Sequence, residues 1–194
     1  MINYKDLILN IVNFENGYSQ SRNWIGFFEI NGLNNLNNIK KAVDVFLDYF
    51  DMDNFVILTS YYIDIDNVDW DLHIENEVKE IEQELVDRQY IPLLSCNNMQ
   101  DDDFFRLDIN FKIIKTNKLD LYKKFSIMGI CDTNIGFSNG HCFFISIKND
   151  IIAYPHGDDG GYGFFYINKK RNNIGYDFLH HIANNKDFNV KINE

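Results

Sequence analysis

The most enzyme-like string in the chain is the run His-Gly-Asp-Asp-Gly-Gly at residues 156–161. A histidine near two carboxylates, Asp158 and Asp159, has the side chains to bind a metal ion or to transfer a proton. The same residue types form tight turns, because Asp and Gly tolerate positive φ angles. Alternating apolar residues flank the run, so the sequence favours a turn between two strands. A small metal-binding enzyme that uses His156, Asp158 and Asp159 is the alternative.

Two further histidine motifs carry weaker chemical signals. His141 precedes Cys142, which could act as a thiol nucleophile, but a cysteine inside an apolar strand is more often a small buried side chain. His180 and His181 are neighbours on a predicted helix, where their side chains point about 100° apart and do not form a ligand pair on one face. We therefore expect no enzymatic activity, no metal and no other cofactor.

Acidic residues are concentrated in the middle of the chain. Between Asp44 and Asp108 there are 18 Asp and Glu residues and three basic ones, so this segment has a charge of −15. The remaining 11 acidic and 15 basic residues give +4, and the whole chain is −11. Such a distribution repels nucleic acid and anionic membranes and favours a positively charged macromolecular partner. The basic clusters are small, which argues against direct nucleic-acid binding.

Size and composition predict a single folded domain over residues 1–194. A chain of 194 residues with 45% hydrophobic and 15% aromatic residues can bury a core without metals or disulfides. Its three cysteines are odd in number and lack CxxC spacing, which is typical of a reducing compartment. The N-terminus lacks the pattern of a signal peptide, and no apolar run is long enough to cross a bilayer. We expect a cytoplasmic protein.

Hydrophobic periodicity predicts helices and strands along most of the chain. Apolar residues at helical spacing predict helices over 3–13, 36–50, 74–88 and 118–130, and one near 174–184 that closes the chain. Alternation predicts strands over 24–30 and 105–113, one long strand over 55–65, and a meander at 142–147, 151–154 and 162–167. Strands that alternate with helices early and pair as hairpins late indicate an α+β fold with a mostly antiparallel β-sheet and several packed α-helices.

The alternation also predicts which side chains face the core. Along 24–30 it places Trp24 and Phe28 on one face and Ile25 on the other. The alternating run that ends at Ile113 predicts that this isoleucine faces inward.

The predicted helix 36–50 carries its charges against local preference. Lys40 lies near its start and Asp48 near its end, opposite to what the helix dipole favours. Asp44 and Asp48 also repel each other at i, i+4. Local rules that are broken without visible compensation indicate candidate functional positions, although a fold can simply tolerate them.

Two features resemble known proteins. The run 142–146, followed by 151–154 and by Asp-Asp-Gly-Gly at 158–161, is similar to an uncharacterised bacterial domain family. That family ends with a strand, a short turn, a strand carrying Tyr-Asp-Asp-Arg-Gly and a final helix. Here residues 155–157 separate the second strand from the acids, and Gly160 stands in place of the arginine. In addition, an acidic, Asn- and Ile-rich single-domain chain of this size resembles the immunity proteins of bacterial contact-dependent growth inhibition and related polymorphic toxin systems.

This resemblance implies an immunity protein that has no catalytic residues and neutralises a cognate toxin. The expected partner is the C-terminal nuclease domain of a contact-dependent growth inhibition effector, plausibly an RNase acting on tRNA, because nucleases are basic where they hold phosphates. The acidic surface would occlude the toxin's substrate-binding surface. An acidic decoy that mimics DNA is a further alternative. The candidate partner-binding residues are Asp64, Asp66, Asp69, Asp71, Glu77, Glu80, Glu84, Asp101, Asp102, Asp103, Tyr61, Tyr62 and Trp70.

Overall fold

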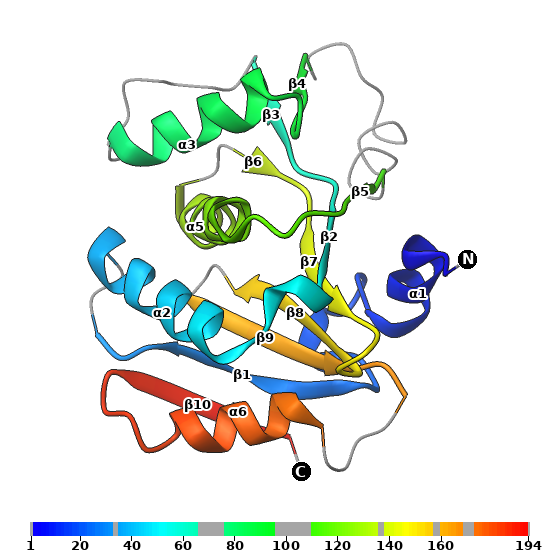
Figure 1. Ribbon diagram of the computed structural model, residues 1–194, viewed down its shortest axis with the longest axis vertical. Coiled ribbons are helices and arrows are strands. Elements are labelled where there is room, and N and C mark those ends of the chain that lie inside the picture. The colour runs from blue at the N-terminus through cyan, green and yellow to red at the C-terminus, as the bar shows by residue number, and fades with distance from the viewer. Residues whose placement is uncertain are drawn as a thin grey trace.

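The main structural element is a seven-stranded β-sheet in which every pair of neighbouring strands is antiparallel (Figure 1). The computed structural model describes residues 2–32, 35–65, 76–95, 110–135, 138–156, 160–168 and 173–193. Across the sheet the strands are ordered β10 (Phe188–Ile192), β1 (Trp24–Ile30), β9 (Gly161–Tyr166), β8 (Ile151–His156), β7 (Cys142–Ser146), β2 (Val56–Thr59) and β5 (Lys112–Ile114). The predicted meander is therefore confirmed as β7, β8 and β9.

A smaller sheet and the helices complete the fold. The smaller sheet has the order β4 (Leu93–Leu94), β3 (Tyr62–Asp64) and β6 (Ser138–Asn139), with β3 parallel to β4 and antiparallel to β6. Within the described residues the α-helices are α1 (Tyr4–Ile11), α2 (Leu36–Tyr49), α3 (Asn76–Asp87), α5 (Leu119–Ile135) and α6 (Ile174–Ile182). Two 3₁₀ turns are η1 (Tyr18–Gln20) and η2 (Met52–Asn54). The predicted α+β fold is confirmed.

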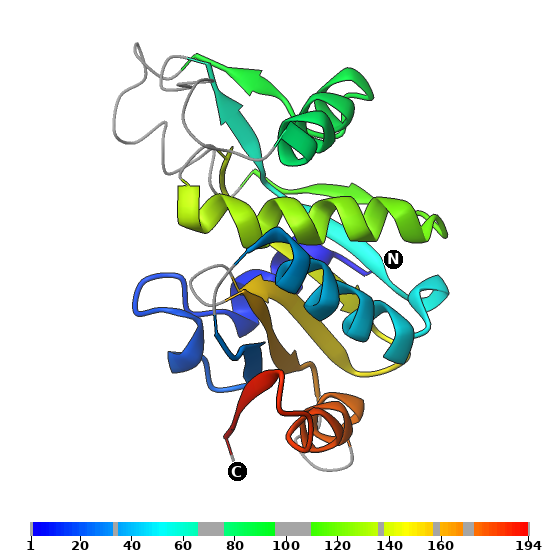
Figure 2. The ribbon, with the colours of Figure 1, turned by 90° about the vertical axis from the view of Figure 1, so that its left-hand side faces the viewer.

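The large sheet has a hydrophobic core on each face. On one face, α2, α3, α5 and α6 contribute to a single continuous cluster of buried residues. On the other face, Ile8 of α1 and Val12 pack with Leu58, Phe143 and Phe165. Figure 2 shows α5 between α3 on one side and α2 on the other. The helix α5 is thus the element that joins α3 to the large sheet.

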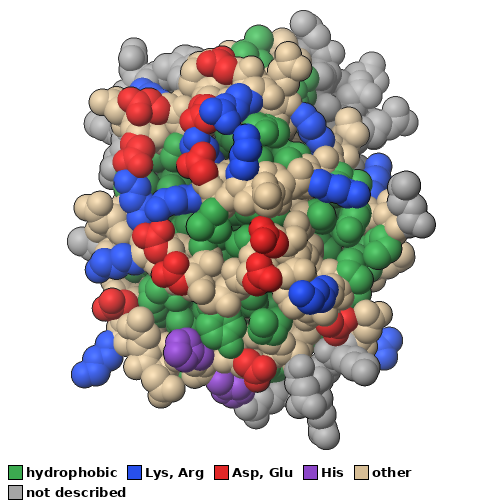
Figure 3. Space-filling model, viewed as in Figure 1, with side chains coloured by type: hydrophobic (Ala, Val, Ile, Leu, Met, Phe, Trp, Pro, Cys, Tyr) green, Lys and Arg blue, Asp and Glu red, His purple; other side chains and the backbone are tan. Residues whose placement is uncertain are grey.

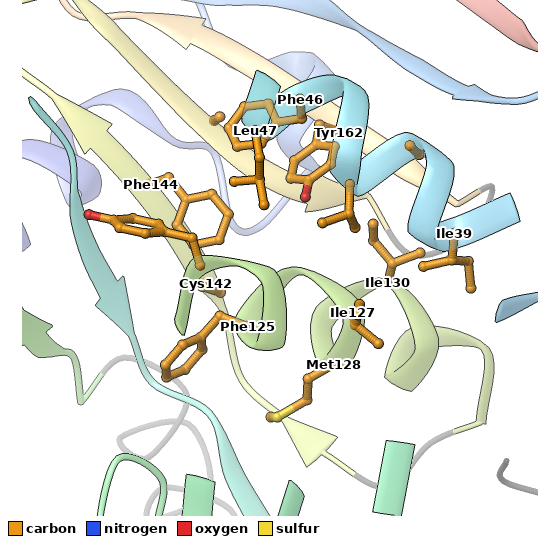
Figure 4. Packing of buried hydrophobic residues seen from close by; sticks show 14 of the residues in the cluster. Ile39, Phe46, Leu47, Phe125, Ile127, Met128, Ile130, Cys142, Phe144 and Tyr162 are labelled. Carbon is orange, nitrogen blue, oxygen red and sulfur yellow. The ribbon is translucent and has the colours of Figure 1, made fainter. Parts of the chain in front are cut away.

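Aromatic rings fill the larger of the two cores. The ring of Phe46 lies 4.2 Å from that of Tyr162 and 6.0 Å from that of Phe144, centroid to centroid, and all three side chains are fully buried. Figure 4 shows Phe46 on one side of α5 and Phe125 and Met128 on the other. Because each large aromatic side chain buries about 150–250 Å², these rings supply much of the apolar area that holds the layers together.

The assignment of faces in β1 is wrong because the strand contains a β-bulge. The pairing of β1 with β9 shifts register between Trp24 and Gly26, and Gly26 has a φ of 147°. A Cβ at Gly26 would lie 2.0 Å from the carbonyl oxygen of Lys191. The bulge places Ile25 in the same core as Phe28, and Trp24 in the core on the opposite face. A bulge adds one residue to a strand, so the side chains before the bulge point to the opposite face from the one that strict alternation with the later residues predicts.

The inward orientation predicted for Ile113 is also wrong. Ile113 is opposite Leu58 in the β2–β5 pair and is 44% exposed, whereas Ile114 is opposite Ile57 and is 7% exposed. Residues 105–109 of the predicted strand lie outside the described residues. The edge position of β5 explains the exposure, since fewer elements cover the outermost strand of a sheet.

The predicted long strand over 55–65 is two strands in two different sheets. The strand β2 ends at Thr59 in the large sheet, and β3 begins at Tyr62 in the small one. The chain returns to the large sheet at Lys112, which pairs directly with Thr59. Residues 60–111 therefore form one long connection between two paired neighbouring strands. We call this segment the excursion and the rest of the chain the scaffold. Figure 1 shows its elements α3, β3 and β4 at one end of the molecule.

Candidate protein-binding region

The excursion carries the entire net charge of the protein. It contains 14 of the 29 Asp and Glu residues and three of the 18 Lys and Arg residues, which gives −11. The scaffold, with 15 acidic and 15 basic residues, has no net formal charge. The fold thus separates a neutral sheet-and-helix scaffold from an acidic segment that leaves it and returns at adjacent positions. A field of one sign over one part of a surface selects and steers partners of the opposite sign.

The helix α3 is fixed to the scaffold by apolar packing on α5. Its buried residues Val78, Ile81 and Leu85 recur at the helical spacing from which this helix is predicted. Phe125 of α5 is fully buried, and its ring lies 6.4 Å from that of Tyr61 and 6.5 Å from that of Tyr90, both in the excursion. The described part of the excursion is therefore a packed layer whose position is set by α5.

Ion pairs between the excursion and the scaffold occupy two of the candidate carboxylates. Glu77 Oε2 lies 2.6 Å from Lys40 Nζ, and Glu84 pairs with both Arg88 and Lys124. Glu80 is exposed and forms no ion pair with any described residue. Figure 3 shows acidic and basic side chains interleaved on this face. Glu77 and Glu84 are thus partly neutralised within the molecule, and a partner would have to compete for them.

Lys124, which pairs with Glu84 of the excursion, is held in its charged form. Burial, the largest single effect, lowers the pKa of Lys124, but the hydrogen bonds from its ammonium to Asp120 and Glu84 and the negative charges of these two carboxylates together raise it above its usual value. Its side chain is 17% exposed.

The charges on α2 are compensated in a similar way. Lys40 pairs with Glu77, and Asp44 Oδ1 lies 2.8 Å from Lys123 Nζ. The unfavourable charge placement within α2 is therefore offset by partners from other helices.

Three of the candidate residues are buried and do not belong to an exposed surface. Tyr61 is 8% exposed, Tyr62 1% and Asp64 2%. Tyr61 and its neighbour Ile63 belong to the same buried cluster as the helices on this face of the large sheet. This burial places them off the open surface, although Tyr61 and Tyr62 also line the cleft described below, so direct contact with a partner stays a prediction for these residues. The other candidates, Asp66, Asp69, Trp70, Asp71, Asp101, Asp102 and Asp103, lie outside the described residues.

A cleft of about 660 Å³ lies where the excursion leaves and rejoins the scaffold. Residues 59–62, 86, 89–94 and 110–112 line it, and most of their side chains are apolar or aromatic. Leu93 at its wall is 47% exposed. The ammonium of Lys112 donates a hydrogen bond to the carbonyl oxygen of Gln89 and lies 6.0 Å from the ring centroid of Tyr90. No sequence pattern indicates this cleft, because its walls come from three separate segments.

Backbone contacts with the scaffold fix the point where the excursion begins. The amide of Ser60 donates to the carbonyl oxygen of His141 at 2.9 Å, and the amide of His141 donates to Ser60 Oγ at 2.9 Å. Gly140 has a φ of 109°, and a Cβ there would lie 2.6 Å from the Ser60 carbonyl oxygen. Gly129 of α5 allows a similarly close approach, because a Cβ would lie 2.3 Å from the hydroxyl oxygen of Tyr61. These contacts hold the base of the cleft in place.

The run at 156–161 joins two paired strands, as the turn interpretation predicts. His156 ends β8 and is opposite Gly161, which begins β9. The His156 ring stacks on Phe27, with centroids 4.9 Å apart and planes within 1°. Asp158 and Asp159 lie outside the described residues, and among the described residues no group of three or more His, Cys, Asp or Glu side chains could hold a metal ion. The metal-binding alternative therefore stays a hypothesis.

The His141–Cys142 pair does not form a nucleophile and its base. The two side chains lie on opposite faces of β7: Cys142 is in the core beneath α2 and α5, whereas His141 contacts Phe14 and Tyr18. The hydroxyl of Tyr18 and Nδ1 of His141 are 2.6 Å apart. Burial raises the pKa of the Cys142 thiol well above its usual range, so this thiol stays protonated and unreactive.

This burial predicts resistance to alkylation. In a Cys96→Ser variant, which removes the cysteine outside the described residues, we expect Cys131 and Cys142 of the native protein to stay unmodified by iodoacetamide at about pH 8. Intact-mass measurement before and after unfolding in guanidinium checks this. Both thiols should react in the unfolded chain, and rapid labelling of Cys142 in the native protein would contradict the assignment.

No known protein family, curated protein or solved structure matches this chain. Within the described residues, no helix combines the length and apolarity needed to cross a membrane.

Proposed function

We propose that this protein is an immunity protein that binds a cognate toxin, a basic nuclease, and occludes its substrate-binding surface. The observation that carries the proposal is the segregation of charge, with −11 in the excursion and no net charge in the scaffold. A nuclease must be basic where it binds phosphates. A protein that presents an acidic region to this surface competes directly with the nucleic acid.

The structure supports a preformed binding region rather than an acidic tail that folds on binding. The described part of the excursion packs on α5 through Val78, Ile81 and Leu85 and is tied to the scaffold by Glu77 and Glu84. A preorganised surface loses less conformational entropy on association. The proposed complex would therefore combine fast, charge-steered association with slow dissociation.

Co-expression with the product of the gene immediately upstream tests the proposal. In that experiment the upstream gene product is expressed in a bacterial host with and without this protein, and growth is measured. The proposal predicts that the upstream product stops growth, that this protein restores it, and that the two co-purify. A toxic upstream product whose effect is not relieved, or a product that forms no complex, would rule the proposal out.

A pair of charge-reversed variants tests whether the excursion is the part that steers association. Glu80→Lys with Asp87→Lys changes two exposed carboxylates of α3, and Asp48→Lys with Asp187→Lys makes the same change in net charge on the scaffold. We expect the first variant to lower the association rate constant about tenfold and the second to lower it less than about twofold. Stopped-flow measurement at low salt separates them. Equal losses in the association rate constant would show that association depends on the total charge of the protein and not on the excursion.

A further inference from the structure

The cleft beneath the excursion has the properties of a pocket for a large apolar side chain. Its volume of about 660 Å³ lies within the range of about 300–1,000 Å³ found for ligand sites. Tyr90 and Phe111 supply aromatic walls, and each is only partly buried. Leu93 is 47% exposed in the wall of the cleft. The few residues that dominate the energy of an interface are those that fill pockets on the partner.

The charge around the cleft restricts what can fill it. Among the described residues the lining has one charged side chain, Lys112, whose ammonium is engaged by the Gln89 carbonyl and faces the Tyr90 ring. These contacts place that cation at the C-terminal end of α3, where the helix dipole favours positive charge. The rest of the excursion is strongly acidic. An anionic ligand would be repelled by the excursion, and a purely polar cation would leave the apolar walls in contact with water.

We infer that this cleft receives an aliphatic or aromatic side chain of the basic partner, flanked in the partner's sequence by lysine or arginine. The inference rests on the proposed function, because it names the part of the toxin that the same region would hold. The apolar side chain fills the cleft between Tyr90, Leu93 and Phe111, and the flanking cations face the acidic excursion. Charge then selects the partner, and the cleft fixes where it docks.

Short labelled peptides test the inference without the toxin. Three peptides are compared: one alternates lysine with leucine, one alternates lysine with serine, and one alternates glutamate with leucine. Fluorescence anisotropy follows the binding of each peptide to the full chain. We expect the lysine–leucine peptide to bind at least about tenfold more tightly than either of the others. Equal binding of the lysine–serine peptide would show that charge alone acts. Equal binding of the glutamate–leucine peptide would show a non-selective apolar surface, and either result overturns the inference.

A matched pair of leucine variants locates the peptide. Leu93→Ser alters the cleft wall, and Leu119→Ser alters a leucine of similar exposure, 50%, at the start of α5. We expect Leu93→Ser to weaken binding of the lysine–leucine peptide about tenfold, and Leu119→Ser to leave it within about twofold of wild type. Thermal unfolding confirms that both variants are folded.

The outcomes of the two tests are separable. Equal losses from the two leucine variants, or failure of every peptide to bind, overturns the cleft assignment. Growth rescue by co-expression decides the proposed function on its own. Rescue with no peptide binding would keep the immunity role and remove the cleft from it. Selective peptide binding without rescue would keep the cleft as a site for basic, apolar segments and remove the immunity role.

Discussion

Replacing Phe125 by alanine is expected to lower the free energy of unfolding by about 3–5 kcal/mol, as buried Phe→Ala substitutions typically do. Phe125 is fully buried in α5, and its ring contacts Tyr61 and Tyr90 of the excursion. The cavity would therefore open between α5 and the excursion. We expect the amides of α3 to exchange through a local opening whose free energy lies well below that of global unfolding. Denaturant titration and native-state hydrogen exchange measure the two quantities.

Phe46→Ala is the matched control for this prediction. Phe46 is equally buried, but its ring stacks on Tyr162 on the other side of α5. We expect a similar loss of about 3–5 kcal/mol, with the amides of α3 still exchanging only through global unfolding. If both variants release α3 to the same extent, Phe125 has no special part in fixing the excursion.

Replacing Gly161 by alanine is expected to destabilise the protein by more than about 3 kcal/mol, at the severe end of overpacking effects. Gly161 begins β9 between β1 and β8, and a Cβ there would lie 1.9 Å from the carbonyl oxygen of Phe28 and 2.8 Å from Cα of Glu29. Both neighbours are backbone atoms of a paired central strand, so they cannot move aside as the end of a flexible side chain would. The midpoint of urea unfolding measures the loss.

Gly32→Ala provides the comparison for Gly161→Ala. Gly32 follows β1 with a φ of 125°, and a Cβ there would meet no atom within 4 Å. Only backbone strain opposes alanine at this position, so we expect a loss of about 1–2 kcal/mol. A Gly161→Ala variant that is no less stable than Gly32→Ala would show that β1 and β9 can separate without cost, contrary to the tight pairing described above.

The elements that the sequence predicts well are those defined by local periodicity. The stripes of α2 and α3 repeat at helical spacing within a single segment, so Val43 and Phe46 or Val78 and Leu85 identify the buried face without tertiary information. The bulge in β1 also left a local signal, because a glycine inside a strand is typical of a bulge. The edge strand β10, Phe188–Ile192, is absent from the prediction because its alternating run is only five residues long and follows the helix that is expected to close the chain.

The break between β2 and β3 could not be predicted from its own residues. Phe55, Ile57, Tyr61 and Ile63 keep the spacing of a single strand across the break, and no glycine, proline or asparagine marks the point where the chain changes sheets. The cause lies far along the chain, where Gly140 and His141 contact Ser60. Pairing of this kind depends on contacts between distant segments, and period-two alternation is the same for one strand as for two.

The candidate site was predictable in its charge and not in its contacts. The acidic segment is visible in the sequence, but the sequence does not show that Lys40 and Lys124 neutralise Glu77 and Glu84. It does contain the signal that Glu82 is buried, since this residue lies four positions after Val78, within the apolar stripe of α3, and it is 1% exposed. Helical spacing therefore determines which carboxylates of α3 can reach a partner.

The most direct test of the central claim is a hydrogen-exchange footprint of the complex with the upstream gene product. If the excursion is the binding region, the amides of residues 76–95, which include α3 and β4, should exchange more slowly in the complex than in the free protein. The amides of α1 and β10 on the scaffold should be unchanged. Protection confined to α1 or β10, with none over residues 76–95, would contradict the claim that the acidic excursion binds the toxin.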